Sequence, residues 1–427
     1  MKIVILGSGI AGVSAGYHLK LAGENSTIYE RDNDWGGLCG NFTIDGFRFD
    51  RFVHFTFAPD DYTKNLFEEA SPTYAHPSVS SNYYNGYWLK HPAQNNLAPL
   101  SVDEKVEIIK GFVNRPKKNI DELENYEDWL RVQYGDYFAE NFPFKYTRKY
   151  WGVEPAKLET KWVGNRMHSP SLDEVLRGSY AVQDTNFYYT SHMKYPKKGG
   201  FRSILNKCRE GLDIKFNKEV VHIDTKSKLV SFKDGSLAKY DRLISSLPLP
   251  ELVRMLDNVP CEVNDSASRL MHTSGYMVSL GFNRPDVAKH LWFYIYDEDI
   301  LASRVYSPSL KSADNVPAGR SSLQAEIFFA NTSSIPDKNL VLENTIEKLV
   351  EMGLFEKKDV IVKDIRFEKY ANIIFDKDIY KNRAIVLEYL GSIGIESIGR
   401  FGKWEYMWTH QAFADGRKVA ECLLKTT

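Results

Sequence analysis

Glycines near the start of the chain have the spacing that brings a polypeptide backbone against a phosphate group. An apolar run over residues 2–6 is typical of a parallel strand buried on both faces, and it leads directly into a helical pattern. At the junction, Gly7 allows a tight turn, Gly9 lets the backbone approach a pyrophosphate, and Gly12 lets helix and strand pack closely. A second strand ends at Glu30, whose carboxylate can accept hydrogen bonds from ribose hydroxyls. This unit predicts a dinucleotide site; the alternative is a helix entry that is rich in glycine for structural reasons alone.

The composition excludes several classes of function. With 427 residues, 43% of them hydrophobic and 26% charged, the chain can form two or three globular domains. A net charge of −1 does not attract nucleic acid or anionic membranes, so an anionic ligand must be bound by local Arg or Lys. The 4 cysteines are scattered without metal-binding spacing, which suits a reducing compartment and no bound metal. The chain opens in a strand and lacks an apolar run of about 20 residues. We therefore expect a cytoplasmic protein without a signal peptide or an integral membrane segment.

The elements that must position this site follow from periodicity and turn signals. Ser101 and Glu104 fit a capping box at the start of a helical stretch over residues 101–140. The expected strands run over residues 218–223, 230–235, 240–248, 276–282, 323–329 and 396–402, and further helices lie near 338–352 and 411–424. These patterns predict an α/β protein with a helical subdomain and an antiparallel sheet.

The segment after Glu30 indicates which dinucleotide the site binds. Gly36 and Gly37 complete an E-x5-G-G pattern that resembles the extended fingerprint of the large FAD family that includes amine oxidases, protoporphyrinogen oxidases and UDP-galactopyranose mutases. Near the C-terminus, Gly399, Arg400 and Gly402 are similar to the strand and turn with which this family returns to the dinucleotide domain. The resemblance implies a discontinuous, Rossmann-like FAD-binding domain. Its expected parts are residues 1–76, 195–255 and 386–427, with a helical subdomain over 97–194 and an antiparallel sheet or substrate domain over 77–96 and 256–385.

Further motifs resemble the UDP-galactopyranose mutases, flavoenzymes that contract a sugar ring without net redox change. The matching segments are Trp88 to Asn96 (W-x3-P-x-Q-N-N), Tyr146 to Gly152 (Y-T-x-K-x-W-G), Trp162 to Arg166 (W-x-G-x-R), Trp292 to Pro308 around Arg304, and Gly399 to Tyr406 (G-R-F-G-x-W-x-Y). His54 stands where these enzymes carry a loop with a histidine near the isoalloxazine. Together the segments follow the family's order along nearly the whole chain, although relatives named amine oxidase or protoporphyrinogen oxidase share many of them.

The sequence departs from the mutase pattern at three places. Phe52 and Val53 precede His54 where the mutases have glycines, which puts in doubt the flexibility of that loop. Asn372 stands where a diphosphate-binding tyrosine is expected, and the residues from Met407 to Gln411 follow Tyr406 where the mutases have an Asn or Asp motif. The native sugar can therefore differ from galactose.

The resemblance implies the following site. Cofactor contacts are expected from Gly7, Gly9, Ile10, Ala11, Gly12, Glu30, Arg31, Gly37, Leu38, His54, Val220, Gly399 and Arg400. Substrate contacts are expected from Gln94, Asn95, Tyr146, Tyr150, Trp151, Arg166, Arg304, Asn372 and Tyr406. Arg166, Arg304 and His54 are the expected catalytic residues. The structural alternatives are a core histidine for His54, a turn cap for Gln94, core aromatics for the tyrosines and Trp151, and surface groups for the arginines.

The implied function is that of a nucleotide-sugar mutase for polysaccharide or glycoconjugate synthesis. N5 of reduced FAD would attack the anomeric carbon of a nucleotide-diphosphate sugar, and ring closure would convert pyranose to furanose. NAD(P)H is a candidate electron donor. The alternatives are an FAD-dependent oxidase or dehydrogenase of the amine oxidase or protoporphyrinogen oxidase type, and a flavoprotein without catalytic activity. The sugar, the nucleotide, the electron donor and the oligomeric state, including a homo-oligomer, stay open.

Overall fold

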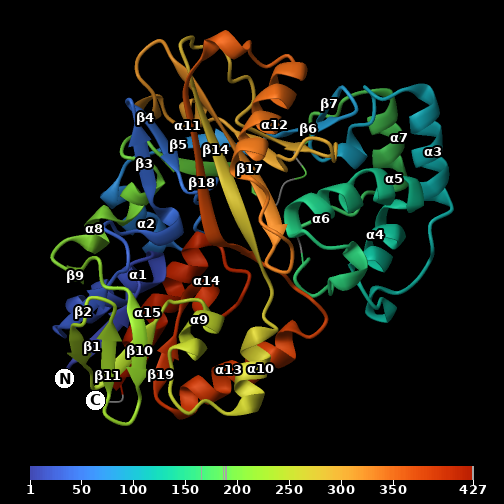
Figure 1. The fold of residues 1–427 in the computed structure, drawn as a ribbon. Helices are drawn as coiled ribbons and strands as arrows, with labels where there is room; N and C mark the ends of the chain where they lie inside the picture. Colours follow the sequence, from blue (N-terminus) through green and yellow to red (C-terminus); the bar gives the residue numbers. More distant parts are fainter. Residues whose placement is uncertain (165, 186, 188–189, 426–427) are drawn as a thin grey trace.

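A parallel sheet joins the two ends of the chain. The computed structural model describes residues 1–164, 166–185, 187 and 190–425. Its five-stranded parallel sheet has the order β19 (Ile395–Ser397), β13 (Arg242–Ser245), β1 (Ile3–Leu6), β2 (Ser26–Tyr29) and β9 (Asp213–Lys215). All four residues of β1 are buried, as the apolar run predicts. The start of the chain and the last described helix lie close to this sheet (Figure 1).

The first and last long helices pack together on this sheet. Helix α1 (Ile10–Leu21) follows β1 directly, and α15 (Thr409–Lys425) lies against it. The hydroxyl of Ser14 donates to the carbonyl oxygen of Phe413 at 2.6 Å. A Cβ added at Gly416 would lie 2.2 Å from the carbonyl oxygen of Ala11, so the two backbones meet without room for a side chain.

Smaller elements complete this part of the molecule. A three-stranded antiparallel sheet is formed by β10 (Val220–Asp224), β11 (Leu229–Phe232) and β12 (Leu237–Lys239). Two strand pairs are β3 (Asn41–Ile44) with β4 (Phe47–Asp50), and β5 (Thr73–Pro77) with β8 (His192–Pro196). The helices are α2 (Asp61–Ala70), α8 (Asn206–Arg209), α9 (Leu249–Arg254), α10 (Cys261–Ser268), α13 (Ile379–Ser392) and α14 (Gly399–Gly402). Short 3-10 helices include η1 (Gly37–Cys39) and η5 (Phe201–Leu205).

A sheet of seven strands, called the long sheet below, runs through the middle of the molecule (Figure 1). Its order is β18 (Val360–Ile373), β14 (His272–Phe282), β17 (Ser321–Ala330), β16 (Arg304–Tyr306), β15 (Trp292–Ile295), β6 (Ser81–Tyr84) and β7 (Tyr87–Lys90). All neighbours are antiparallel except β15 and β6. Every residue of β14 and β17 is buried, and helices α11 (Pro308–Lys311) and α12 (Lys338–Glu351) accompany this sheet.

A group of helices packs beside the sheet, drawn in green and teal in Figure 1. It contains α3 (Val102–Val113), α4 (Tyr126–Tyr134), α5 (Asp136–Asn141), α6 (Pro143–Trp151) and α7 (Leu172–Tyr180). The predicted capping box of Ser101 and Glu104 is present at the start of α3, and Ser171 with Glu174 forms another at α7. The chain leaves this group through strand β8, which begins at His192.

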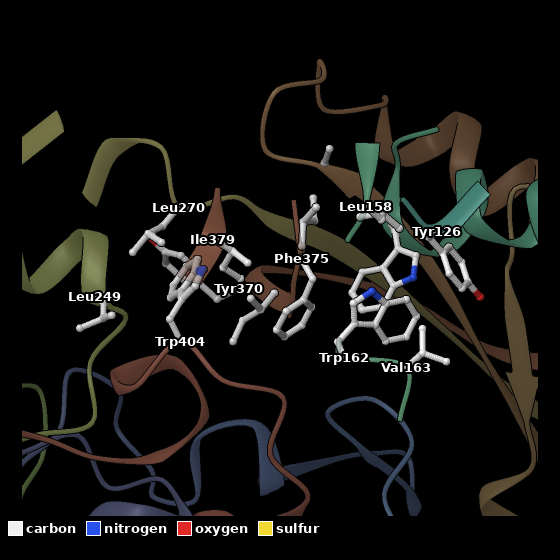
Figure 2. Packing of buried hydrophobic residues seen from close by; sticks show 14 of the residues in the cluster. Tyr126, Leu158, Trp162, Val163, Leu249, Leu270, Tyr370, Phe375, Ile379 and Trp404 are labelled. Atoms are coloured by element: carbon white, nitrogen blue, oxygen red, sulfur yellow. The ribbon is translucent and has the colours of Figure 1, made fainter. Parts of the chain in front are cut away.

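The molecule has three parts: the part around the parallel sheet, the long sheet, and the group of helices α3 to α7. One hydrophobic cluster connects these three parts. Figure 2 shows Trp404 beside Leu249 and Leu270, Phe375 in the middle, and Trp162 with Tyr126 at the other end. These side chains come from the parallel-sheet part, from the end of β18 and from the helical group. The shared core fixes the three parts relative to one another, and therefore also the cavity between them. None of the helices within the described residues combines the length and the apolar character that crossing a bilayer requires.

Candidate functional site

A cavity of about 790 Å³ lies where the three parts meet. Its lining includes the predicted glycines after β1, the turn after β4, the helix α6, strand ends of the long sheet, and the segment around α14. A cavity that collects residues from separate parts of the fold is a typical small-molecule site.

The glycine end of the cavity has the geometry of a phosphate cradle. A Cβ added at Gly9 would meet no atom within 4 Å, so the backbone there faces open space at the start of α1. Gly37 has φ +54°, and a Cβ on it would lie 3.2 Å from the Cα of Gly9. A Cβ on Gly12 would lie 2.0 Å from the carbonyl oxygen of Gly7, so this glycine allows helix and strand to pack closely and does not line the cavity. This arrangement fits the pyrophosphate of a dinucleotide.

Glu30 is fixed at the end of β2 and lines the same end of the cavity. One of its oxygens, Oε2, accepts hydrogen bonds from the backbone N–H of Ser8 at 2.8 Å and from the Ser8 hydroxyl at 2.7 Å. Its other oxygen accepts from the N–H of Asp32 at 3.1 Å. The carboxylate therefore has a defined orientation, with accepting capacity left for ribose hydroxyls.

The C-terminal segment forms the opposite rim of the cradle. Gly399 has φ +76°, a Cβ on it would lie 2.7 Å from the Cβ of Ala11, and its N–H donates to Asp415 Oδ2 at 2.8 Å. Asp415 belongs to α15 and also pairs with Lys403. The residues present thus fit FAD at this end of the cavity: an open backbone at Gly9, an oriented acid at Glu30 and a glycine rim at Gly399.

His54 lies on a constrained turn beside this cradle. Phe52 has φ +62°, and the next N–H, that of Val53, donates to Glu326 Oε1 at 2.6 Å. The His54 ring stacks on Phe201 with 5.0 Å between ring centres. Burial lowers the pKa of His54 to about 4, with the nearby Asp50 carboxylate opposing that shift. His54 is therefore a neutral imidazole at pH 7.

A buried ion pair supports the floor of this turn. Lys311 Nζ lies 2.6 Å from Asp50 Oδ2, and both side chains are almost fully buried. Asp50 also accepts from the hydroxyl of Tyr195 at 2.8 Å and from the N–H of Phe201 at 3.0 Å. Burial lowers the pKa of Lys311, although the Asp50 charge opposes the shift. The pair joins β4 of the parallel-sheet part to α11 of the long sheet.

Arg304 faces the cavity from β16 and is neutralised by a neighbouring acid. Its Nε donates to Glu326 Oε2 at 2.7 Å, because Arg304 and Glu326 are register partners on β16 and β17. Burial lowers the pKa of Arg304, but the Glu326 charge outweighs it and raises that pKa well above its usual range. Arg304 is thus permanently charged and already paired.

Arg166 and Arg400 have no such acid. Their guanidinium carbons lie 4.4 Å and 4.9 Å from the centre of the Tyr406 ring. Arg166 donates to the carbonyl of Trp162, and its Nε has no hydrogen-bond partner. The Nε of Arg400 is likewise unpartnered, and neither guanidinium has a carboxylate at ion-pair distance in the part of the chain that the structure describes. Arg166 and Arg400 are therefore two uncompensated cations on the cavity wall beside Tyr406.

Asn372 connects Arg400 to Tyr150. Its Oδ1 accepts from Arg400 Nη2 at 3.1 Å and from the Tyr150 hydroxyl at 3.2 Å, while its Nδ2 has no partner although the side chain is buried. The Arg304 guanidinium carbon lies 5.9 Å from the Tyr150 ring centre. Arg400, Asn372, Tyr150 and Arg304 thus line one wall of the cavity, and their donor groups suit a ligand that carries several acceptor oxygens.

The structure places most of the predicted residues on the cavity wall. Those lining it are Gly7, Gly9, Ile10, Ala11, Glu30, Arg31, Gly37, Leu38, His54, Val220, Gly399 and Arg400 from the cofactor set, and Gln94, Tyr146, Tyr150, Trp151, Arg166, Arg304, Asn372 and Tyr406 from the substrate set. Gly12 and Asn95 do not line it. Asn95 is fully buried, and neither atom of its amide has a hydrogen-bond partner among the described residues.

Sequence reasoning missed Glu326 and Ser8. Glu326 is the one acid in the apolar run from Leu323 to Phe329, and a lone carboxylate in a buried strand requires a partner, so a signal was present. Ser8 lies inside the glycine motif, and nothing in its spacing indicates its bonds to Glu30.

Fold and site together define a flavin-binding protein with a dinucleotide-binding α/β architecture. Residues 10–359 match the model of the family described as flavin containing amine oxidoreductase. The chain belongs to this family.

Individual similarities point in two directions. The chain is 23% identical over 447 residues to the 4,4'-diaponeurosporene oxygenase of Staphylococcus aureus (strain USA300), covering 89% of this chain and 85% of the relative. Among solved structures, reduced UDP-galactopyranose mutase superposes with a TM-score of 0.93 at 24% identity, covering 100% of this chain and 96% of that one. A putrescine oxidase variant superposes with a TM-score of 0.65 at 16% identity, covering 99% of both chains. The structural similarities establish the fold.

Proposed function

We propose that this protein is a flavin-dependent nucleotide-sugar mutase that interconverts pyranose and furanose rings for polysaccharide or glycoconjugate synthesis. The observation that carries the proposal is the pair of uncompensated guanidiniums, Arg166 and Arg400, around Tyr406. Two fixed cations without an acid match the charge of a bound diphosphate, whose oxygens accept the bidentate hydrogen bonds that guanidiniums offer.

Different side chains of the cavity have different roles in such a reaction. Reduced flavin, when bound in the glycine cradle, supplies a nucleophilic nitrogen for the anomeric carbon. Arg166, Arg400 and Arg304 hold the departing diphosphate and stabilise its charge. Tyr146 and Tyr150, stacked with 5.5 Å between ring centres, form an aromatic part of the cavity wall. Gln94 lines the cavity, and its Nε2 donates to the carbonyl of His168 at 3.2 Å, which holds the amide in one orientation.

The relation to an oxygenase supports an oxidoreductase as the second candidate. The name of that relative refers to a diaponeurosporene, whereas this wall carries three arginines, of which Arg304 alone is paired with an acid within the part of the chain that the structure describes. Placing an apolar ligand against unpaired, half-buried cations would desolvate them without a compensating anion. The charge of the wall therefore favours a nucleotide sugar. The four cysteines form no disulfide, which suits the reducing conditions of the cytoplasm.

The decisive experiment compares the reduced and the oxidised protein. Protein with bound FAD is reduced with dithionite, incubated with a panel of UDP- and dTDP-hexoses, and followed by NMR of the furanose anomeric protons. We expect furanose to appear with one or more sugars only in the reduced sample, and to form more slowly with Arg166→Ala at sugar concentrations that do not saturate the variant. If no sugar isomerises while another substrate reduces the flavin and oxygen yields peroxide, the protein is an oxidase and the mutase proposal is wrong.

A further inference from the structure

One buried carboxylate joins the cationic wall to the turn that carries His54. Glu326 has no exposed side-chain surface, and the Arg304 side chain is 18% exposed. Glu326 Oε2 lies 2.7 Å from Arg304 Nε and 2.5 Å from Arg304 Nη2, and its Oε1 accepts from the N–H of Val53 at 2.6 Å. The two oxygens of a single side chain thus contact a ligand-facing guanidinium and a cofactor-facing turn.

The turn that carries His54 requires contacts that hold its backbone in place. Phe52 occupies the left-handed region with φ +62°, which a bulky side chain rarely adopts, so surrounding contacts must hold it there. Its N–H contacts the sulfur of Met277 at 3.1 Å, and its ring lies 5.4 Å from that of Phe328. Of these contacts, the bond from Val53 to an ionised acceptor is the strongest.

We propose that Glu326 is a positioning residue that couples anion binding at Arg304 to the placement of the turn over residues 52–54. An anion on Arg304 shares the guanidinium charge that otherwise neutralises Glu326. The carboxylate then depends more on its remaining donor, and the bond from the Val53 N–H becomes stronger. Anion binding therefore holds the turn, and with it His54, in the described position. By linkage, displacing the turn weakens anion binding by the same factor. The inference rests on the proposed function, because the anion is the diphosphate of the substrate.

Amide hydrogen exchange of Val53 measures this coupling directly. Protein with bound FAD is compared with and without saturating UDP, following the peptide that contains residues 50–57. We expect UDP to slow the exchange of the Val53 amide by about fivefold or more, the usual lower range of coupling between sites. In Glu326→Gln the negative charge is removed, and we expect UDP to leave that exchange rate unchanged. Glu343→Gln, an exposed change on α12, serves as the matched control and should behave as the unmodified protein.

A second variant covers the possibility that Glu326→Gln does not fold. Glu326→Asp keeps the charge, but its side chain is too short to reach both Arg304 and Val53, so it should also lose the effect of UDP. Equal protection by UDP in the unmodified protein and in either variant would overturn the proposal, as would UDP binding without any change at Val53. Protection by UDP without formation of a furanose would contradict the proposed function and leave the coupling intact. Absence of UDP binding would contradict both.

Discussion

Arg166 and Arg400 reach the same aromatic ring from different parts of the fold. Arg166 lies between α6 and α7 of the helical group and Arg400 lies in α14 of the parallel-sheet part, yet their guanidinium carbons are 4.4 Å and 4.9 Å from the centre of the Tyr406 ring. Two like charges held this close repel each other, and a divalent anion between them relieves the repulsion. The relative position of the two parts therefore determines the strength of the anion site.

Replacing Arg166 tests the first of these cations. A hydrogen bond to a charged group contributes about 1.5–3 kcal/mol, so Arg166→Ala should raise the dissociation constant of UDP by about 10- to 100-fold. Calorimetric titration of the FAD-loaded protein measures it. The exposed Arg177 on α7 offers a control, since Arg177→Ala should not change the constant. An unchanged constant in Arg166→Ala would remove this residue from the site.

Asn372 allows the charge of the wall to be changed without changing its shape. Asn372→Asp places a carboxylate where Oδ1 now accepts from Arg400 at 3.1 Å. One of the two free cations is then neutralised, and UDP binding should weaken by about tenfold, typical of one close charge pair. The loss should shrink at high salt, because screening reduces the repulsion between UDP and the new carboxylate. Equal or tighter UDP binding in this variant would show that Arg400 does not face the anion.

Substitutions at two glycines distinguish loss of cofactor binding from loss of backbone packing. In Gly9→Ala the methyl group meets no protein atom within 4 Å, so the FAD-free protein should keep its stability to within about 0.5 kcal/mol. The same methyl group occupies the space expected for the pyrophosphate, so FAD content should fall sharply. In Gly12→Ala the Cβ lies 2.0 Å from the Gly7 oxygen, and both stability and FAD should be lost. Flavin absorbance and thermal unfolding distinguish the two. Retention of FAD in Gly9→Ala would place the cofactor elsewhere.

Three histidines with lowered pKa make the stability of the protein depend on pH on the acid side. Burial is the first cause that lowers the pKa of His54, His91 and His272, each to about 4. An unfolded imidazole takes up a proton near pH 6.5. Between pH 6.5 and 4 the unfolded state therefore binds more protons, and stability decreases as the pH falls, whereas above pH 6.5 the full stability is present.

His272 is the appropriate residue for the test because it does not line the cavity. His272→Phe should reduce the slope of unfolding free energy against pH by at most about 1.4 kcal/mol per pH unit, the contribution of one proton. Urea unfolding at pH 7, 6 and 5 gives the slope. A slope equal to that of the unmodified protein would mean that His272 is protonated in the folded state.

Breaking the buried pair below His54 should destabilise the whole protein. Lys311→Met leaves Asp50 charged and buried, at a cost of about 3–5 kcal/mol. Combining it with Asp50→Asn should recover much of this loss, since the new amide can still accept from Tyr195. Chemical denaturation of the single and double variants provides the measurement. A single variant as stable as the unmodified protein would contradict the account of this pair.

The sequence reveals those parts of the site that depend on local geometry. The turn at Gly7, the start of α1 at Ile10 and the helix expected at 411–424, observed as Thr409–Lys425, follow from residue types a few positions apart. The bond between Glu326 and Arg304 depends on the register of β16 and β17, and no local pattern specifies that register. The meeting of Arg166 with Arg400 depends on the packing of three parts around one core, which periodicity does not describe.

The contact between α1 and α15 has a consequence for synthesis of the protein. The cradle residues around Gly9 are translated before their opposite rim at Gly399 and before the helix that supports that rim. A nascent chain therefore exposes half of a coenzyme groove until α15 has been translated. A chain truncated before α15 would lack the helix that holds the Gly399 rim, so we expect such a chain to retain no FAD.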